Sequence, residues 1–329
     1  MRSKRKFIIA GAAITAVVII AALVLLNHRK NSIYRGNGIV YIVEDNDRSG
    51  FLVFNSEGVY EERIGSRSET FWLACSVYGD ETVSADNRDN IYRFTEQGIE
   101  RFENVETGIM AVLKSEEGYV LISQTEDSVC VSLYSDDFND KLNQQEVPGI
   151  FQHCHAEGDS VYYSVCGDKE AFTGVYRYGA GEKINERLYY NSEASEEIYP
   201  FLYGEKLYLA KNKLISQNGN QDILKVCEMQ ADGELLEVSD MEEPLKKVVA
   251  EEGEIYALSG VNSAIVSKIN LSDDSQTKTF SLDDESALGL YVFEGKIYAL
   301  TDRAIYELKG DKLLKRQEIN AVNTANIFY

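Results

Sequence analysis

Alternation of apolar and polar positions, punctuated by glycine, dominates the chain from Gly38 onward. The clearest stretch places Gly295 before an alternating strand (KIYAL), follows it with a second strand (AIYEL), and ends at Gly310. Period-two alternation is typical of β-strands, and glycine supplies the backbone conformations that tight turns need. The pattern therefore predicts successive β-hairpins.

The same phrase recurs at a steady interval. Successive copies are 39 to 49 residues apart, and most contain a second strand that ends at a further glycine. In the third and sixth units the acid pairs Asp136-Asp137 and Asp273-Asp274 stand in its place, and aspartate also tolerates turn geometry. A further apolar strand precedes the next unit, for example at 198–202 and 245–249. The glycines that open the units are Gly38, Gly79, Gly118, Gly158, Gly204, Gly253 and Gly295.

Four strands in about 42 residues is the dimension of a propeller blade. Residues 38–329 are therefore predicted to form an all-β, seven-bladed β-propeller of four-stranded antiparallel blades. The alternative is another all-β fold in which the repeated phrase only marks hairpins. The blade count is open to revision at the long fifth unit, 204–252, which has room for an insertion.

The two ends of the repeat predict how the ring closes. The first unit lacks an inner strand before Gly38, whereas residues 321–329 resemble the inner strands of the other units. We expect this tail to pair with strand 39–43 and complete the first blade, which removes an open sheet edge that would invite aggregation.

The repeat, of the form G-x-[IV]-Y-x-[LV] followed by [LI]-Y-x-[LF] and a glycine turn, resembles the broad superfamily of bacterial propellers with quinoprotein-like, WD40-like or TolB-like repeats. The resemblance spans about residues 38–329 and points to no single member. The Trp-Asp dipeptide of WD40 repeats is absent, and Trp72 is the only tryptophan. The resemblance implies a fold and says little about activity.

The N-terminal region predicts a membrane anchor. Phe7 to Leu26 is an uncharged run of 20 residues, long enough at about 1.5 Å per residue to cross a bilayer core of about 30 Å. Residues 1–6 form a basic stub, and 27–37 form a polar tether. The excess of basic residues before the run places the N-terminus in the cytoplasm and the propeller outside. A cleaved signal peptide is the rival interpretation, but its apolar core is usually shorter and ends at a small-x-small site.

Charge narrows the range of partners. The net charge is −21, yet residues 1–35 carry seven basic residues and no acid, so the remainder has 26 basic against 54 acidic residues. A domain this acidic repels the phosphate backbone of nucleic acids and the anionic headgroups of lipids. This argues against nucleic acid as a partner. Solubility alone also explains such a charge.

The five cysteines are an odd number, are widely spaced and have no CxxC pair, so they do not indicate a disulfide framework. They are Cys75, Cys130, Cys154, Cys166 and Cys227.

Two segments have some features of metal sites. Asp45 to Gly50 has oxygen side chains at alternate positions, but Arg48 intrudes and Ser56 stands where a calcium loop needs glutamate. In His153-Cys154-His155 the two histidines share one strand face and Cys154 points to the other, so the ligands diverge. Pairing across the following turn is expected to place Cys154 near Tyr162, with Cys166 about four residues beyond. We predict no metal, cofactor or catalytic residue at either segment, and no Cys154–Cys166 disulfide.

Other candidate catalytic groups are equally weak. The three histidines are His28, His153 and His155, and no Gly-x-Ser-x-Gly elbow accompanies them. Paired carboxylates can do acid–base work, but here they fall mostly at predicted turns. Tyrosines that recur with the repeat indicate packing. The acid pairs are Glu116-Glu117, Asp136-Asp137, Glu242-Glu243, Glu251-Glu252 and Asp283-Asp284; the tyrosines are Tyr41, Tyr162, Tyr208, Tyr256 and Tyr298.

The sequence thus favours a single-pass, N-in membrane protein with an extracytoplasmic propeller. This propeller is expected to act as a non-enzymatic platform that binds a protein, peptide or glycan on the loops around its central channel. The alternative is an extracytoplasmic hydrolase, lyase or cyclase with its site at the central channel. Convergence of three or more acids or histidines there would favour the enzyme. A sensory ectodomain is a third interpretation, and its short cytoplasmic stub would need a membrane partner.

Overall fold

The structure is a computed structural model, and its regular elements are all strands within the residues it describes. These are 38–44, 48–54, 60–66, 76–78, 81–85, 88–95, 98–193, 196–213, 224–230, 233–241, 245–251, 254–260, 263–270, 278–293, 295–319 and 327–328. The all-β prediction is confirmed for this part of the chain. The predicted membrane-spanning segment 7–26 and tether 27–37 lie outside it. None of the described residues belongs to a helix with the length and apolarity that crossing a bilayer requires.

The strands form seven four-stranded antiparallel sheets, one for each copy of the repeat. The first sheet has the order β28-β1-β2-β3, with β28 (Ile327–Phe328), β1 (Gly38–Glu44), β2 (Arg48–Phe54) and β3 (Tyr60–Ser66). The second has β4 (Ser76–Tyr78), β5 (Glu81–Ala85), β6 (Ile91–Thr95) and β7 (Gly98–Phe102), and the third has β8 (Ile109–Ser115), β9 (Gly118–Gln124), β10 (Ser128–Tyr134) and β11 (Lys141–Pro148).

Each of the other four sheets is made of four strands that are consecutive in the chain. The fourth has β12 (Ile150–Glu157), β13 (Ser160–Cys166), β14 (Thr173–Gly179) and β15 (Ile184–Asn191), and the fifth has β16 (Glu196–Tyr203), β17 (Lys206–Lys213), β18 (Leu224–Met229) and β19 (Leu235–Met241). The sixth has β20 (Leu245–Glu251), β21 (Glu254–Ser259), β22 (Ser263–Asn270) and β23 (Lys278–Asp283), and the seventh has β24 (Ala287–Phe293), β25 (Lys296–Thr301), β26 (Ala304–Lys309) and β27 (Lys312–Glu318).

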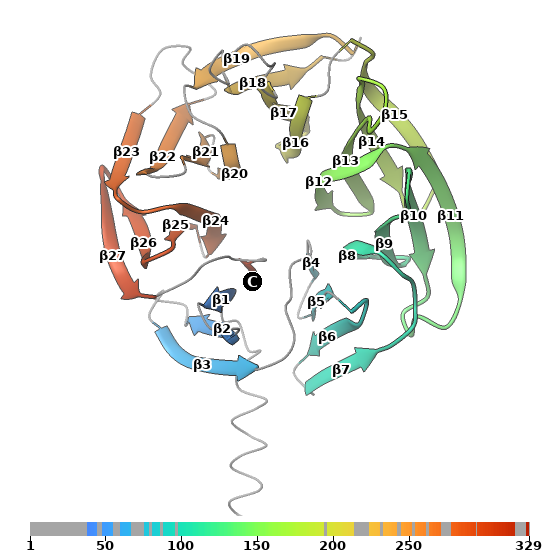
Figure 1. Ribbon diagram of the computed structural model, residues 1–329, viewed down its shortest axis with the longest axis horizontal. Helices are drawn as coiled ribbons and strands as arrows, with labels where there is room; N and C mark the ends of the chain where they lie inside the picture. The colour runs from blue at the N-terminus through green and yellow to red at the C-terminus, as the bar shows by residue number, and fades with distance from the viewer. Residues whose placement is uncertain are drawn as a thin grey trace, which may run out of the picture.

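The sheets stand around a common axis in a propeller-like ring (Figure 1). The first strand of each sheet lies nearest the axis and the fourth lies at the rim. Because each sheet is antiparallel, the turns between its first and second strands and between its third and fourth strands gather on one face of the ring. The remaining loops and the crossovers between sheets gather on the opposite face.

Apolar packing between neighbouring sheets explains the alternation seen in the sequence. On β9, Tyr119 and Leu121 pack against Val83 and Ile91 of the second sheet. The residues between them on β9 belong instead to a cluster shared with the fourth sheet, which includes Tyr163 and Tyr178. Both faces of the sheet are therefore buried, each against a different neighbour.

The recurring tyrosines belong to this packing, as predicted. Tyr208, Tyr256 and Tyr298 are buried, with exposed fractions of 4%, 7% and 1%. Tyr162 is partly buried against the cluster formed by Val175, Ile198 and their neighbours. The structure does not describe the side chain of Tyr41.

The glycine turns are confirmed where the structure describes them. Gly158, Gly204 and Gly295 have φ angles of 56°, 61° and 69°, in the left-handed region that favours glycine. In the third unit the aspartates do not take this conformation. Phe138 does, with φ of 59°, and its ring stacks on Tyr119 at a centroid distance of 4.3 Å. Ring packing on Tyr119, in the same sheet, compensates for the backbone conformation of this phenylalanine.

The C-terminal strand closes the ring, as the sequence predicted. In β28, Phe328 pairs with Ile39 and Ile327 pairs with Val40 of β1. The first sheet therefore combines strands from both ends of the described chain.

We expect removal of residues 327–329 to lower the free energy of unfolding by more than about 2 kcal/mol, beyond the range of ordinary surface changes. The physical reason is that β1 loses its partner strand and the first sheet loses its covalent link to the last. Urea unfolding of the full chain in detergent measures the effect, and removal of Tyr329 alone is the control. An unchanged unfolding midpoint for the longer truncation would contradict this role of β28.

Candidate functional site

Titratable side chains gather on β12, β16 and β20, the inner strands of three successive sheets. These strands follow one another around the axis (Figure 1). Seven of the eight residues of β12 are partly exposed, whereas β10 is buried throughout. An innermost strand has no further strand on its axial side, so polar side chains are tolerated there.

A hydrogen-bonded group joins β12 to β16 across the boundary between two sheets. Nε2 of His153 lies 3.0 Å from Oε1 of Glu197, and the hydroxyl of Tyr199 donates to the same oxygen at 3.0 Å. The rings of His153 and Tyr199 stack with centroids 3.5 Å apart. The side chains of His153 and Glu197 are 28% and 32% exposed, so solvent reaches this group.

His155 and Lys247 extend the group along the channel. Nε2 of His155 lies 3.6 Å from Oε2 of Glu157, too far for a hydrogen bond, and it has no hydrogen-bond partner among the described residues. Lys247 is exposed on β20, and its charge acts on His153, Cys154 and His155.

Burial controls the protonation of this group. It lowers the pKa of His153 although Glu197 opposes the shift, and Lys247 lowers it further. Burial likewise lowers the pKa of His155 against the effect of Glu157. It raises the pKa of Tyr199, which therefore keeps its proton and donates to Glu197. Both histidines are consequently neutral at pH 7.

The His153-Cys154-His155 segment is confirmed as divergent. Counted from the turn pair Glu157 and Ser160, Cys154 pairs with Tyr163, so the expected position beside Tyr162 was wrong by one residue. Cys154 packs against the apolar cluster between the third and fourth sheets, and burial raises its pKa to about 12. Cys166 pairs with Ile150, and both cysteines are free. Within the described ranges no group of three or more His, Cys, Asp or Glu side chains could hold a metal ion.

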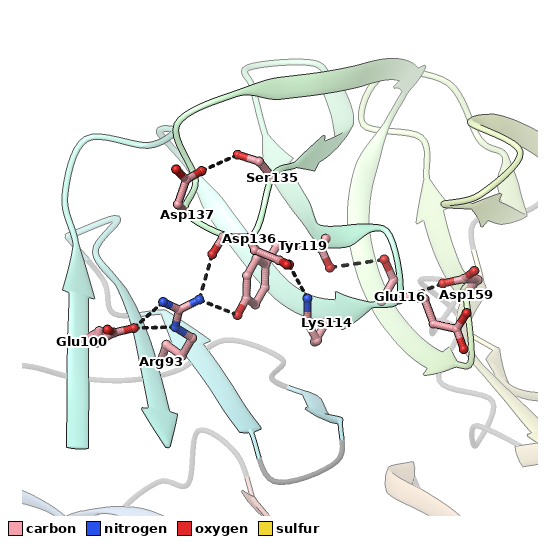
Figure 2. Close-up of polar contacts among 11 residues, drawn as sticks. Arg93, Glu100, Lys114, Glu116, Tyr119, Ser135, Asp136, Asp137 and Asp159 are labelled. Carbon is pink, nitrogen blue, oxygen red and sulfur yellow. Dashed lines mark hydrogen bonds and ion pairs between the residues drawn. The ribbon is translucent and has the colours of Figure 1, made fainter. Parts of the chain in front are cut away.

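The acid pairs of the third unit contribute to joints between sheets rather than to a shared site. Arg93 of β6 donates to Glu100 at 2.6 Å, to the carbonyl of Asp136 at 2.8 Å and to the hydroxyl of Tyr119 at 3.3 Å (Figure 2). Lys114 pairs with the carboxylate of Asp136. These contacts join the second and third sheets at the face that carries the turns.

A similar joint links the third and fourth sheets, where the backbone N–H of Glu116 donates to Oδ1 of Asp159 at 2.9 Å (Figure 2). Asp137 accepts hydrogen bonds from Ser135 and Asn139 within its own turn, and these lower its pKa to about 2. The structure does not bring the predicted acid pairs together at the channel.

The remaining sequence candidates are only partly described. Asp45 to Asp47, Glu242-Glu243 and Glu252 lie outside the described residues. Arg48 and Gly50 belong to β2, and Asp284 takes a left-handed turn conformation with φ of 62°.

Sequence reasoning missed the partners of His153. Glu197, Tyr199 and Lys247 lie on the apolar strands that precede the opening glycines of the fifth and sixth units. The sequence pattern already indicates that these are inner strands. The polar residues on them could therefore have been identified as candidates for the site. The contact between them requires three sheets in register around the axis, which no local pattern reveals.

Comparison with known proteins places the fold and leaves the activity open. No protein-family model matches the chain, and no curated protein matches it. Among solved structures, a protein named as a 6-phosphogluconolactonase from Bacteroides fragilis NCTC 9343 has a TM-score of 0.61 at 11% identity, over 88% of this chain and 96% of that one. One so named from Bacteroides uniformis ATCC 8492 has a TM-score of 0.60 at 10% identity, over 89% and 99%.

YCF48, solved bound to D1 peptide, has a TM-score of 0.54 at 13% identity, over 82% of this chain and 87% of that one. At these identities the likeness shows a propeller-like fold alone. Two proteins with a similar fold are thus named as lactonases, and a third was solved with a bound peptide.

The lowered pKa values of the channel histidines predict a pH-dependent stability. In the unfolded chain a histidine has a pKa near 6.5, which is higher than its pKa in this fold. Between these two pKa values the unfolded state binds more protons than the folded state. Stability is therefore full above about pH 6.5 and falls as the pH drops below it. Urea unfolding of the full chain across this window measures the slope.

His153→Gln should flatten that slope, and His28→Gln, in the tether, should leave it unchanged. The carboxylates of Glu228 and Glu254 do not interfere, because their pKa values are lowered from 4.5 and they titrate below this window. Equal slopes for wild type and His153→Gln would contradict the assignment.

Proposed function

We propose that the chain is a membrane-anchored, extracytoplasmic propeller that binds a protein or peptide partner at its central channel, without catalysing a reaction. The observation that carries the proposal is the partly exposed group of His153, Glu197 and Tyr199 on the channel wall. On the middle strands β9 and β10, by contrast, the strand faces are buried almost throughout. A hydrogen-bonded aromatic and charged group that solvent reaches suits recognition, because such side chains are common energetic anchors of interfaces.

Two further observations support the proposal. The uncharged run 7–26, with basic residues before it, supports an N-in anchor that places the propeller outside the cytoplasm. The peptide complex of YCF48 demonstrates that a propeller-like fold of this kind accommodates a peptide in another protein.

The second candidate is an extracytoplasmic enzyme. The neutral His153 beside Glu197 is the arrangement that a general base needs, which favours this candidate. Within the described ranges, however, only these two acids or histidines converge, short of the three that would favour the enzyme. Hydrolysis of a lactone or ester by the wild type that is lost in His153→Gln would support the enzyme over the binding platform.

The anchor has a direct test in cell fractionation. Because residues 7–26 are apolar throughout, the full chain should stay in the membrane pellet after carbonate extraction, and a chain lacking 7–26 should not. In intact cells, protease added outside should remove the propeller and leave the stub. Protection of the propeller until the cells are lysed would contradict the proposed orientation.

The channel as binding site is tested by affinity capture with a matched pair of variants. Full chain in detergent is exposed to surface extracts, and retained proteins are identified by mass spectrometry. A specific partner should be retained about tenfold less by Glu197→Gln, as expected for an energetic anchor. The exposed Glu318→Gln on rim strand β27 should retain it fully. Equal retention of the partner by both variants would show that the site lies elsewhere than the channel. If the wild type retained no specific partner, the proposed binding function would be contradicted.

A further inference from the structure

Glu196, the first residue of β16, is the centre of a compact polar group between the fourth and fifth sheets. Its Oε2 lies 3.1 Å from Nζ of Lys211 on β17 and accepts a hydrogen bond at 3.4 Å from Nδ2 of Asn191, the last residue of β15. The side chains of Glu196 and Lys211 are only 14% and 16% exposed. One carboxylate oxygen therefore contacts both an amine and an amide in a largely buried setting.

Neighbouring groups hold this carboxylate in place. The backbone N–H of Glu196 donates to the hydroxyl of Thr173 at 2.7 Å, and its carbonyl accepts from Nε2 of Gln152 at 2.8 Å. The hydroxyl of Tyr189 donates to Oε2 of Glu196 at 3.4 Å and accepts from Nζ of Lys211 at 3.2 Å. Both the backbone and the side chain of Glu196 are thus fixed against Lys211.

The side-chain amide of Asn191 is polarised at both of its ends. Oδ1 of Asn191 accepts a hydrogen bond from the backbone N–H of Glu193 at 2.9 Å. A donor at this oxygen stabilises the negative charge that develops there when a nucleophile attacks Cγ. Nδ2 already contacts Glu196, so a proton on that carboxyl group is within reach of the leaving nitrogen.

We propose that Lys211 and Asn191 join in an intramolecular amide bond, with Glu196 carrying the proton between their two nitrogens. The bond links β17 of the fifth sheet to β15 of the fourth, so a covalent cross-link adds to the packing between these sheets. It does not depend on the proposed function of the channel.

The reaction begins from an ion pair. Burial acts to lower the pKa of Lys211, but Glu196 and Tyr189 outweigh it and the pKa is raised, so the side chain starts as an ammonium. Transfer of one proton to Glu196 gives a neutral amine and a carboxylic acid. Partial burial assists this transfer, because it removes part of the hydration that stabilises the two charges.

The amine then attacks the amide in a step that balances without a co-reactant. The Nζ–Cγ bond forms and the Cγ–Nδ2 bond breaks, while Glu196 gives its proton to Nδ2 and takes one from Nζ. Ammonia leaves and takes up that last proton from Glu196, so the products are an amide, a carboxylate and an ammonium ion. No atom is oxidised or reduced. The fixed contacts of Glu196 with both nitrogens supply the proximity that such a step needs.

Mass spectrometry of the full chain, purified in detergent and then unfolded, tests the bond. The intact mass should be lower than the mass of the sequence by one molecule of ammonia. Trypsin should not cleave after Lys211, because its amine is blocked. Residues 188–206 and 207–213 should therefore appear as one linked species, and fragmentation should place the link between Asn191 and Lys211.

Three variants separate the bond from a simple ion pair. Lys211→Arg keeps the positive charge but should lose the link, because a guanidinium stays protonated and cannot attack. Glu196→Gln should also leave the chain unlinked, because it removes the proton carrier. Lys206→Arg is the matched control on the same strand, where the side chain is 61% exposed and pairs with Glu228, and it should stay fully linked.

A wild-type chain of full sequence mass, cleaved normally after Lys211, would overturn the bond. The same loss of ammonia in Lys211→Arg would also overturn it, because the loss would then arise elsewhere, as by cyclisation of an asparagine. A wild-type amount of link in Glu196→Gln would contradict the role of Glu196. Because the wild-type measurement is made on unfolded chain, it stands whether or not a variant folds.

Discussion

Burial of both faces of a sheet, as the third sheet shows, is the constraint on which this structure depends. A four-stranded sheet of this composition has apolar side chains on both faces, as Tyr119 and Val120 on β9 illustrate. One neighbour can cover only one face, so each sheet needs two, and a row of sheets ends with uncovered faces unless it closes into a ring. The pairing of β28 with β1 makes that closure covalent, since the last strand of the chain becomes part of the first sheet.

The same constraint decides where function can reside. The faces of middle strands such as β9 and β10 are committed to packing, so polar side chains occupy the turns, the crossovers, the rim strands and the innermost strands. At the crossovers, partly buried acids serve the fold. Glu106 accepts hydrogen bonds from Ser123 and Tyr134 at 3.0 Å, and Glu285 accepts from Thr301 and Tyr306 at 2.6 Å. The channel wall of β12, β16 and β20 combines titratable groups from three sheets with exposure to solvent.

Polar contacts between sheets add directional constraints to the apolar packing. Arg93 reaches Tyr119 and the carbonyl of Asp136 of the neighbouring sheet at once in one relative position of the two sheets. The stacked pair of His153 and Tyr199 acts in the same way between the fourth and fifth sheets.

The sequence by itself determined the strands, the period and the closing tail, because period-two alternation and glycine turns are local and each recurs in many copies. It also identified the recurring tyrosines as packing residues, and Tyr208, Tyr256 and Tyr298 are buried. Only the tertiary structure decided that Phe138, not an aspartate, takes the left-handed turn position, because ring packing on Tyr119 from another strand stabilises it. Only the tertiary structure brought His153 to Glu197, which is 44 residues away, and placed Lys247 in electrostatic range of the histidines. Such contacts depend on how three sheets align around an axis, and that alignment is set by packing across all their faces.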